Sequence, residues 1–386
     1  MEKLIDERGN THSLTMQLGK DGQGTLYATK NPTVVIRDSQ DREGDRLLYD
    51  DVKLLPLSEV DNILLPDCCL RKPSVGYSLN IPEGFAPLSN IMSSDKNNES
   101  LYLKTGGVKR RLGLLVNLAK ILAELHGLAV MYASMSPNRV FISNDNSSNL
   151  VYLLYSVKMS CFMSFKVDDD GDPYMAPEAK SGKGACLAGD VYAYAALARD
   201  LLTDYETRPI ITDGISALFR QAFGSADKRP TIMDFYTLFT KTSDCLLTCQ
   251  KCGTGFLSDA PKCPACSAAP PKMMEACIYD IISETRVDRG VKILEFAPGR
   301  QCFWNYHTES ALLCETPKPA IDCAFNISAD KKLHFIFKNL MDKPITLNEK
   351  TVAPGQSGAV ALPAKKILIS YKLCANTERF IEMAMK

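Results

Sequence analysis

Residues 130–143 of the chain read VMYASMSPNRVFIS. Two apolar runs flank a polar turn that contains a proline, and the second run has the length of a short buried strand. Just before this stretch, residues 112–130 carry apolar side chains at helical spacing, at Leu114, Leu115, Leu118, Ile121, Leu122 and Leu125. This spacing predicts a long helix with one broad buried face. The quoted stretch is therefore predicted to be a loop between that helix and a strand.

The composition is that of an ordinary globular protein. The 386 residues are 45% hydrophobic and 23% charged, and Lys plus Arg equal Asp plus Glu at 45 each. This length allows two or three domains, and the charge balance gives no reason to expect a nucleic acid or a membrane surface as a partner. The start, MEKLIDERGN, has no apolar signal-peptide core, and no apolar run is long enough to span a bilayer. We therefore expect a cytoplasmic protein.

The remaining sequence divides into regions of different character. Residues 14–37 predict short strands around a glycine-rich turn, and residues 189–203 and 231–244 predict two further helices. Residues 245–271 are rich in Cys, Gly, Pro and Ala, and short strands with turns follow beyond residue 290. The predicted fold class is therefore α+β, with a small all-β domain over residues 272–386.

A series of short motifs runs from residue 14 to residue 243. In chain order they are a glycine-rich turn with Gly19, Gly22 and Gly24, the strand VVIR ending at Arg37, GYSLNIPEGFAPL at 76–88, the opening loop, MAPE at 175–178, DVYA at 190–193 and KRPT at 228–231. In this order they resemble the motifs of protein kinases, and more narrowly those of a bacterial kinase branch. The resemblance implies a bilobal kinase-like fold, with an N-lobe over residues 1–80 and a C-lobe over residues 81–244. It also implies that the three glycines and Arg37 lie where nucleotide phosphates bind.

The resemblance assigns scaffold roles to three further residues. Glu178 and Arg229 stand where kinases have a Glu–Arg ion pair. Asp190 stands where kinases have an aspartate that holds the backbone of the catalytic loop by hydrogen bonds. All three residue types are present. For the glutamate of the kinase helix C, Glu43 and Glu59 are both candidates.

The residues that would carry out phosphoryl transfer are replaced. Ser134 stands in the place of the catalytic aspartate, Arg139 in that of the magnesium-binding asparagine, and Tyr155 in that of the main magnesium-binding aspartate, the Asp of the DFG motif. Arg37 replaces the lysine of the third strand. Phosphoryl transfer requires metal ligands and a carboxylate near the attacking hydroxyl. The resemblance thus implies a pseudokinase without catalytic residues, in which ATP or another nucleotide could bind without a Mg²⁺ site.

Four of the fourteen cysteines form a C-x2-C-x10-C-x2-C pattern, at Cys249, Cys252, Cys263 and Cys266. Four thiolates at this spacing can surround a Zn²⁺ ion tetrahedrally, and a closed set of four sulfurs is typical of structural sites. The pattern predicts a zinc ribbon over residues 245–271, folded by its metal. Disulfides or a redox pair are the alternatives. The other cysteines mostly stand singly in apolar stretches, which predicts small buried side chains.

The order of the regions is similar to that in bacterial kinases of tellurium-resistance-associated systems, which are grouped with a metal-dependent protein phosphatase and a von Willebrand A protein. That resemblance implies that the chain is a scaffold or allosteric regulator and that its partner is one of those two proteins. It also implies that the C-terminal β domain is an interaction module. Two alternatives stay open. One is an ATP-binding enzyme of kinase fold with non-standard group transfer or weak serine/threonine kinase activity. The other is an assembly protein whose pocket is filled by side chains such as Tyr155.

Overall fold

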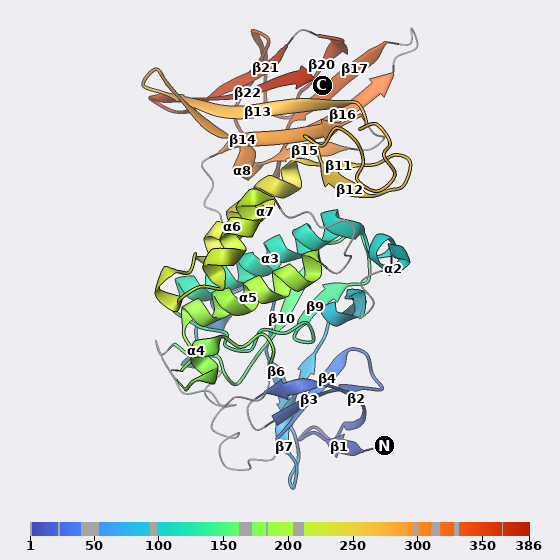
Figure 1. The fold of residues 1–386 in the computed structure, drawn as a ribbon, viewed down its shortest axis with the longest axis vertical. Coiled ribbons are helices and arrows are strands. Elements are labelled where there is room, and N and C mark those ends of the chain that lie inside the picture. The colour runs from blue at the N-terminus through green and yellow to red at the C-terminus, as the bar shows by residue number, and fades with distance from the viewer. Residues whose placement is uncertain are drawn as a thin grey trace. The chain divides into compact units, whose positions relative to one another are not determined.

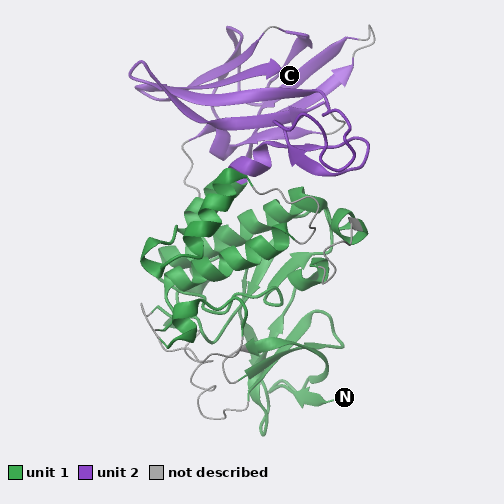
Figure 2. Ribbon diagram, in the orientation of Figure 1, with its two compact units in different colours: residues 1–239 green, residues 240–386 purple. Residues whose placement is uncertain are grey.

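The computed structural model describes residues 2–21, 24–39, 54–92, 99–161, 172–182, 184–203, 212–296, 300–309, 317–327, 332–364 and 366–386. The chain forms two compact units, unit 1 over Met1–Phe239 and unit 2 over Thr240–Lys386 (Figures 1 and 2). Within the described ranges, no helix is long and apolar enough to cross a membrane.

Unit 1 begins with a six-stranded antiparallel sheet of order β1-β2-β3-β4-β7-β6. The strands are β1 (Lys3–Ile5), β2 (Thr11–Asp21), β3 (Gly24–Thr29), β4 (Val34–Ser39), β6 (Pro66–Cys69) and β7 (Val75–Asn80). An isolated bridge joins Asp6 to Leu70, and Arg71 N donates to Ile5 O across 2.7 Å. The two outer strands therefore meet, and the sheet closes on itself like a small barrel.

The rest of unit 1 is mainly helical, with a second sheet beside the longest helix. The helices are α2 (Glu99–Lys104), α3 (Gly107–Gly127), α4 (Pro177–Lys180), α5 (Leu187–Leu202), α6 (Asp213–Ala222) and α7 (Ile232–Asp244), with short 3₁₀ turns at Leu57–Glu59, Leu88–Ile91 and Ala226–Lys228. The second sheet has the order β5-β10-β9-β8, from β5 (Ile63–Leu64), β8 (Phe85–Pro87), β9 (Val140–Ser143) and β10 (Val151–Leu154). Tyr194 of α5 donates a hydrogen bond to the Leu115 carbonyl of α3 across 2.7 Å, which fixes the two central helices against each other.

Unit 2 contains a short hairpin and two larger antiparallel sheets. The hairpin is β11 (Leu246–Thr248) and β12 (Gly255–Leu257). One sheet has the order β14-β13-β22-β21-β18-β19, from β13 (Met273–Ile282), β14 (Thr285–Glu295), β18 (Ile345–Leu347), β19 (Lys350–Val352), β21 (Ile367–Cys374) and β22 (Thr377–Met385). The other has the order β15-β16-β17-β20, from β15 (Gln301–Trp304), β16 (Pro319–Ile327), β17 (Leu333–Asn339) and β20 (Ser357–Leu362), with α8 (Asn305–Thr308) after β15.

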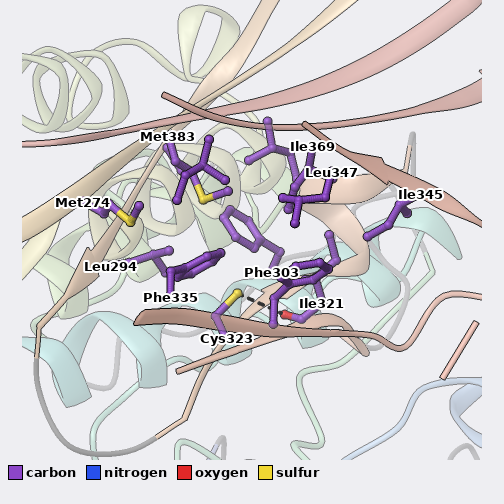
Figure 3. Close-up of a cluster of buried hydrophobic side chains, with 14 of the residues drawn as sticks. Met274, Leu294, Phe303, Ile321, Cys323, Phe335, Ile345, Leu347, Ile369 and Met383 are labelled. Carbon is purple, nitrogen blue, oxygen red and sulfur yellow. Dashed lines mark hydrogen bonds between the residues drawn. The ribbon is translucent and has the colours of Figure 1, made fainter. Parts of the chain in front are cut away.

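The two large sheets of unit 2 share one hydrophobic core (Figure 3). Leu294, Ile369 and Met383 come from the six-stranded sheet, and Phe303 and Phe335 come from the four-stranded one. Alternate side chains of each strand enter this layer, as the burial pattern of β17 shows. The arrangement is that of two sheets packed face to face.

The predicted α+β class is confirmed, and the three predicted long helices are present as α3, α5 and α7. Helix α3 begins five residues before the predicted start, because Gly106 adopts a left-handed φ of 90° at its N-terminus. The prediction of buried single cysteines is right for Cys323 but wrong for Cys161 and Cys374, which are exposed. Cys374 ends β21 at a hairpin turn, where an apolar sequence neighbourhood does not bring burial.

Candidate functional site

Four cysteine sulfur atoms lie together in unit 2. The Sγ atoms of Cys249, Cys252, Cys263 and Cys266 all lie within 4.8 Å of one another. The Cys249 and Cys266 sulfurs are 3.5 Å apart, and those of Cys252 and Cys263 are 3.6 Å apart. Around Zn²⁺, with bonds of about 2.3 Å, tetrahedral sulfurs are about 3.8 Å apart. The four cysteines, none of them in a disulfide, could therefore bind a metal ion such as zinc, with no position left open for a substrate.

Each CxxC pair forms the same tight turn. Gly253 N donates to Cys249 O across 2.8 Å, and Ser267 N donates to Cys263 O across 2.9 Å. Gly253 and Ser267 both have left-handed backbone, with φ of 74° and 56°. A glycine favours this turn at Gly253, but a serine gives no such signal at Ser267, because residues other than glycine rarely adopt this conformation.

The turn also favours the thiolate form of Cys252. Its sulfur lies 3.2 Å from the Thr254 hydroxyl oxygen. Burial by itself would raise the pKa of Cys252, but hydrogen bonds from the hydroxyl and the backbone of Thr254, together with the contacts to the Cys266 and Cys249 sulfurs, lower it to about 6. Because metal ions bind the thiolate, this contact favours metal binding near neutral pH.

The cysteine cluster packs on the larger sheet of unit 2. Cys249 and Cys263 are buried in one apolar cluster with Phe256 of the hairpin, Met273 of β13 and Ile293 of β14. The cysteine segment is too short to enclose a core of its own, and these two strands supply the missing apolar surface.

In unit 1, Asp190 binds the backbone of the loop at residues 130–143. The carboxylate is 1% exposed and accepts hydrogen bonds from Tyr132 N and Ala133 N, both across 2.7 Å. His126 Nε2 lies 3.1 Å from the same carboxylate. Ala133 has a left-handed φ of 55°, an unfavourable conformation for alanine. Asp190 therefore fixes the backbone where it is most strained.

Glu178 and Arg229 form an ion pair. Arg229 donates from both terminal nitrogens to the two carboxylate oxygens of Glu178, with 2.9 Å between Nη2 and Oε2. Arg229 also donates to the Ala188 carbonyl across 2.9 Å and lies over the ring of Tyr192, 5.2 Å from its centroid. The pair thus joins α4 to the start of α5.

All four positions at which the kinase resemblance expects chemistry are buried. The exposed fractions are 0% for Arg37, 4% for Ser134, 2% for Arg139 and 1% for Tyr155. These side chains contact other protein groups and do not line an open surface. Burial of this extent limits their access to a dissolved substrate.

Arg37 occupies the space beside the glycine-rich turn. A Cβ atom at Gly24 would lie 2.4 Å from the guanidinium carbon of Arg37, so the two residues are in close contact. The guanidinium carbon lies 5.6 Å from the ring centroid of Tyr77, and that ring meets Tyr155 edge-on at 6.1 Å. Arg37, Tyr77 and Tyr155 therefore pack as one buried group.

The loop is also joined directly to β2. Asn138 Nδ2 donates to Leu18 O across 2.6 Å, and Arg139 Nη2 donates to Lys20 O across 2.5 Å. Ser89 donates to Asn138 Oδ1 across 2.5 Å. The sequence gives no signal of this role for Asn138, because an asparagine after a proline is common in turns.

The remaining predicted positions are only partly within the described residues. Gly19 lies in β2, with open space where a Cβ would be, and Gly24 begins β3. Glu59 ends a short 3₁₀ turn. Gly22 and Glu43 lie outside the described residues.

No protein-family model matches this chain, and no curated protein matches it either.

Proposed function

We propose that unit 1 is a kinase-like domain that does not transfer phosphate, and that the chain acts as a scaffold or allosteric regulator of a partner protein. The observation that carries this proposal is the pair of hydrogen bonds from Asn138 and Arg139 to the carbonyls of Leu18 and Lys20. In kinases, the phosphates of ATP lie between the glycine-rich turn and the catalytic loop. Here β2, the strand before that turn, is hydrogen-bonded directly to the loop that stands in the place of the catalytic loop.

The side chains at the reactive positions support the same conclusion. Ser134 offers a hydroxyl that cannot act as a base near neutral pH, and Arg139 places a cation where Mg²⁺ would have to bind. Tyr155 replaces a carboxylate with a buried phenol ring. Catalysis of phosphoryl transfer depends on charge neutralisation at these points.

Unit 2 supplies the second part of the proposal. We take its four cysteines to bind one structural Zn²⁺ in a ribbon-like site, and its two-sheet domain to be the interaction module. The partner, a metal-dependent protein phosphatase or a von Willebrand A protein, follows from the family resemblance alone.

Nucleotide binding by the full chain tests the proposal. A ligand that binds the folded state raises the melting temperature according to its concentration and affinity. We expect ATP, with or without Mg²⁺, to raise the melting temperature no more than tripolyphosphate at the same concentration. The comparison with tripolyphosphate isolates the contribution of the adenine base, which a nucleotide site would recognise and a surface that binds only phosphates would not.

An adenine-dependent rise in melting temperature, together with Mg²⁺-dependent turnover of ATP, would instead favour the ATP-using enzyme. Removal of zinc by a chelator serves as the positive control, since it should lower the melting temperature in the same assay.

A further inference from the structure

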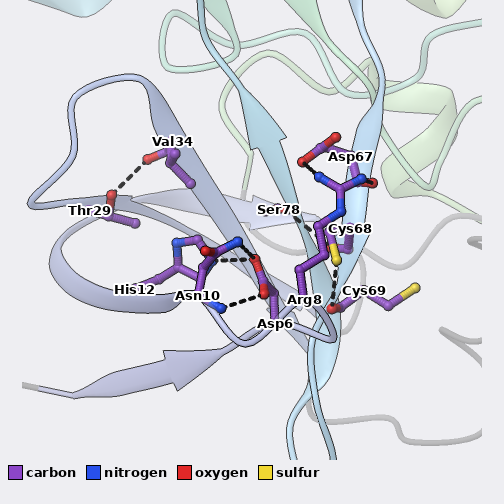
Figure 4. A network of polar contacts seen from close by, with 10 residues as sticks. All are labelled: Asp6, Arg8, Asn10, His12, Thr29, Val34, Asp67, Cys68, Cys69 and Ser78. Carbon is purple, nitrogen blue, oxygen red and sulfur yellow. Dashed lines mark hydrogen bonds and ion pairs between the residues drawn. The ribbon is translucent and has the colours of Figure 1, made fainter.

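A polar pocket opens at one end of the closed sheet of unit 1. Figure 4 shows the polar contacts around Asp6 and Asp67, two of the residues that line it. Its volume is about 440 Å³, within the range of small-molecule sites. The walls come from strands β2, β3, β4, β6 and β7 and from the turns beside β1 and β3, at Asp6, Asn10, Thr11, His12, Ser13, Thr29, Lys30, Asn31, Val34, Asp67, Ser78 and Asn80. The mouth of a small barrel is a common place for a ligand.

The charged acceptors of this pocket are already occupied by protein donors. Asp6 is 2% exposed and accepts from Asn10 N across 2.8 Å, from Asn10 Nδ2 across 3.0 Å and from His12 Nε2 across 3.0 Å. Arg8 donates to the Asp67 carboxylate across 2.7 Å. Neither carboxylate therefore presents an uncompensated negative charge to a ligand.

Several donors remain available. His12 turns Nε2 toward the acceptor Asp6, which requires a proton on that nitrogen, and its side chain is only 10% exposed. With the proton on Nε2, Nδ1 carries a lone pair and can only accept a hydrogen bond; in the part of the chain that the structure describes, it has no hydrogen-bond partner. The side chains of Lys30, Ser13 and Asn80 likewise form no hydrogen bond or ion pair with a described residue.

We propose that this pocket binds the oxyanion group of a small molecule, a carboxylate or a phosphate. An oxyanion only accepts hydrogen bonds, and three groups left free around the pocket can donate them: the Lys30 ammonium, the Ser13 hydroxyl and the Asn80 amide. The inference goes beyond the proposed scaffold function and does not depend on it.

The test titrates the full chain with inorganic phosphate and, separately, with acetate, at constant ionic strength set by chloride. The melting temperature should rise saturably with at least one of the two anions. In Lys30→Met, the dissociation constant for that anion should rise about tenfold or more, or about 1.4 kcal/mol, as expected for the loss of one charge-assisted hydrogen bond. Lys350→Met, an exposed lysine of unit 2, is the matched control and should bind like wild type.

The two arms identify the chemistry, because saturation by phosphate alone points to a phosphate ligand and saturation by acetate points to a carboxylate. Lys30 is exposed, so Lys30→Met should fold like wild type. If neither anion gives a saturable rise, or if Lys30→Met binds as tightly as Lys350→Met, the proposal is overturned.

Discussion

Asp6 and Asp190 are carboxylates buried to 2% and 1% exposure, and hydrogen bonds compensate both of them. Burial alone would raise the pKa of Asp6, but hydrogen bonds from His12 and Asn10 lower it to about 2. Both side chains therefore stabilise a turn through hydrogen bonds to a buried carboxylate and not through apolar packing. Each supplies a stability that mutation should remove.

For Asp6→Ala, we predict a loss of about 1–3 kcal/mol in the free energy of unfolding of unit 1 at neutral pH, because buried donors lose their acceptor. The pKa of Asp6 in the folded protein, about 2, lies below its ordinary value of 3.8. The contribution of Asp6 is therefore complete above the ordinary value and is lost as the pH falls toward the folded one. Urea unfolding of wild type and Asp6→Ala should show a difference in the free energy of unfolding that becomes smaller in acid. If this difference did not change with pH, the ionised carboxylate of Asp6 could not be its source.

For Asp190→Ala, we predict a larger loss, about 2–5 kcal/mol, because two buried backbone N–H groups lose their acceptor. The strained φ of Ala133 is then no longer held in place. Chemical denaturation followed by circular dichroism measures the change. Asp227→Ala, at an exposed aspartate in the same unit, is the control and should stay within about 0.5 kcal/mol of wild type. Equal effects of the two substitutions would contradict the role given to Asp190.

These two residues also show what the sequence could predict. Asp190 was singled out because it stands in a motif that places an aspartate beside a loop. Asp6 stands in a charged stretch, IDERGNTH, where nothing distinguishes it from solvated neighbours. Its burial depends on the bridge from Asp6 to Leu70, 64 positions away, and such long-range pairing has no local signal.

At the scale of elements, the cysteine hairpin and the strands beneath it behave as one structure. The spacing of the cysteines was enough to predict the metal-binding cluster. Its packing on β13 and β14 was not predictable, because Met273 and Ile293 look like any other apolar strand residues. The metal should therefore stabilise those strands as well as the hairpin.

For Cys263→Ser, we predict loss of one bound Zn²⁺ per chain and a lower melting temperature of unit 2. Native mass spectrometry counts the metal, and calorimetry records the transition. Cys245→Ser is the matched control, because Cys245 lies near the cluster but its sulfur contacts Val291 O at 3.8 Å and not the other four sulfurs. Zinc retained in Cys263→Ser, or lost equally in Cys245→Ser, would refute the four-cysteine site.

At the scale of the whole molecule, the chain divides within α7, after Phe239. The sequence gives no sign of a division there, because the helical periodicity of α7 continues without a break to Asp244. The last turn of α7 has its polar contacts in unit 2, where Asp244 lies 2.7 Å from Lys292 Nζ and 2.8 Å from His307 Nε2. These partners are 48 and 63 positions along the chain, beyond the reach of any local pattern.

His307 has its protonation state fixed by its surroundings. Its Nδ1 accepts a hydrogen bond from Trp304 N across 3.0 Å, so that nitrogen carries no proton and Nε2–H faces Asp244. Burial lowers the pKa of His307, although Asp244 opposes the shift. Because the folded pKa lies below the ordinary value of 6.5, His307 contributes stability above that value and loses it as the pH falls.

With separate cores, the two units should unfold in separable steps, and Asp244→Ala should affect only one of them. We predict that it lowers the free energy of unfolding of unit 2 by about 2–4 kcal/mol, since the removal of one partner leaves the buried His307 and Lys292 unsatisfied. Unit 1, which Asp190→Ala destabilises, should keep its wild-type transition. Urea unfolding monitored by hydrogen exchange resolves the two steps, because each amide reports on its own unit. A single transition that both substitutions shift equally would mean that the chain unfolds as one cooperative body.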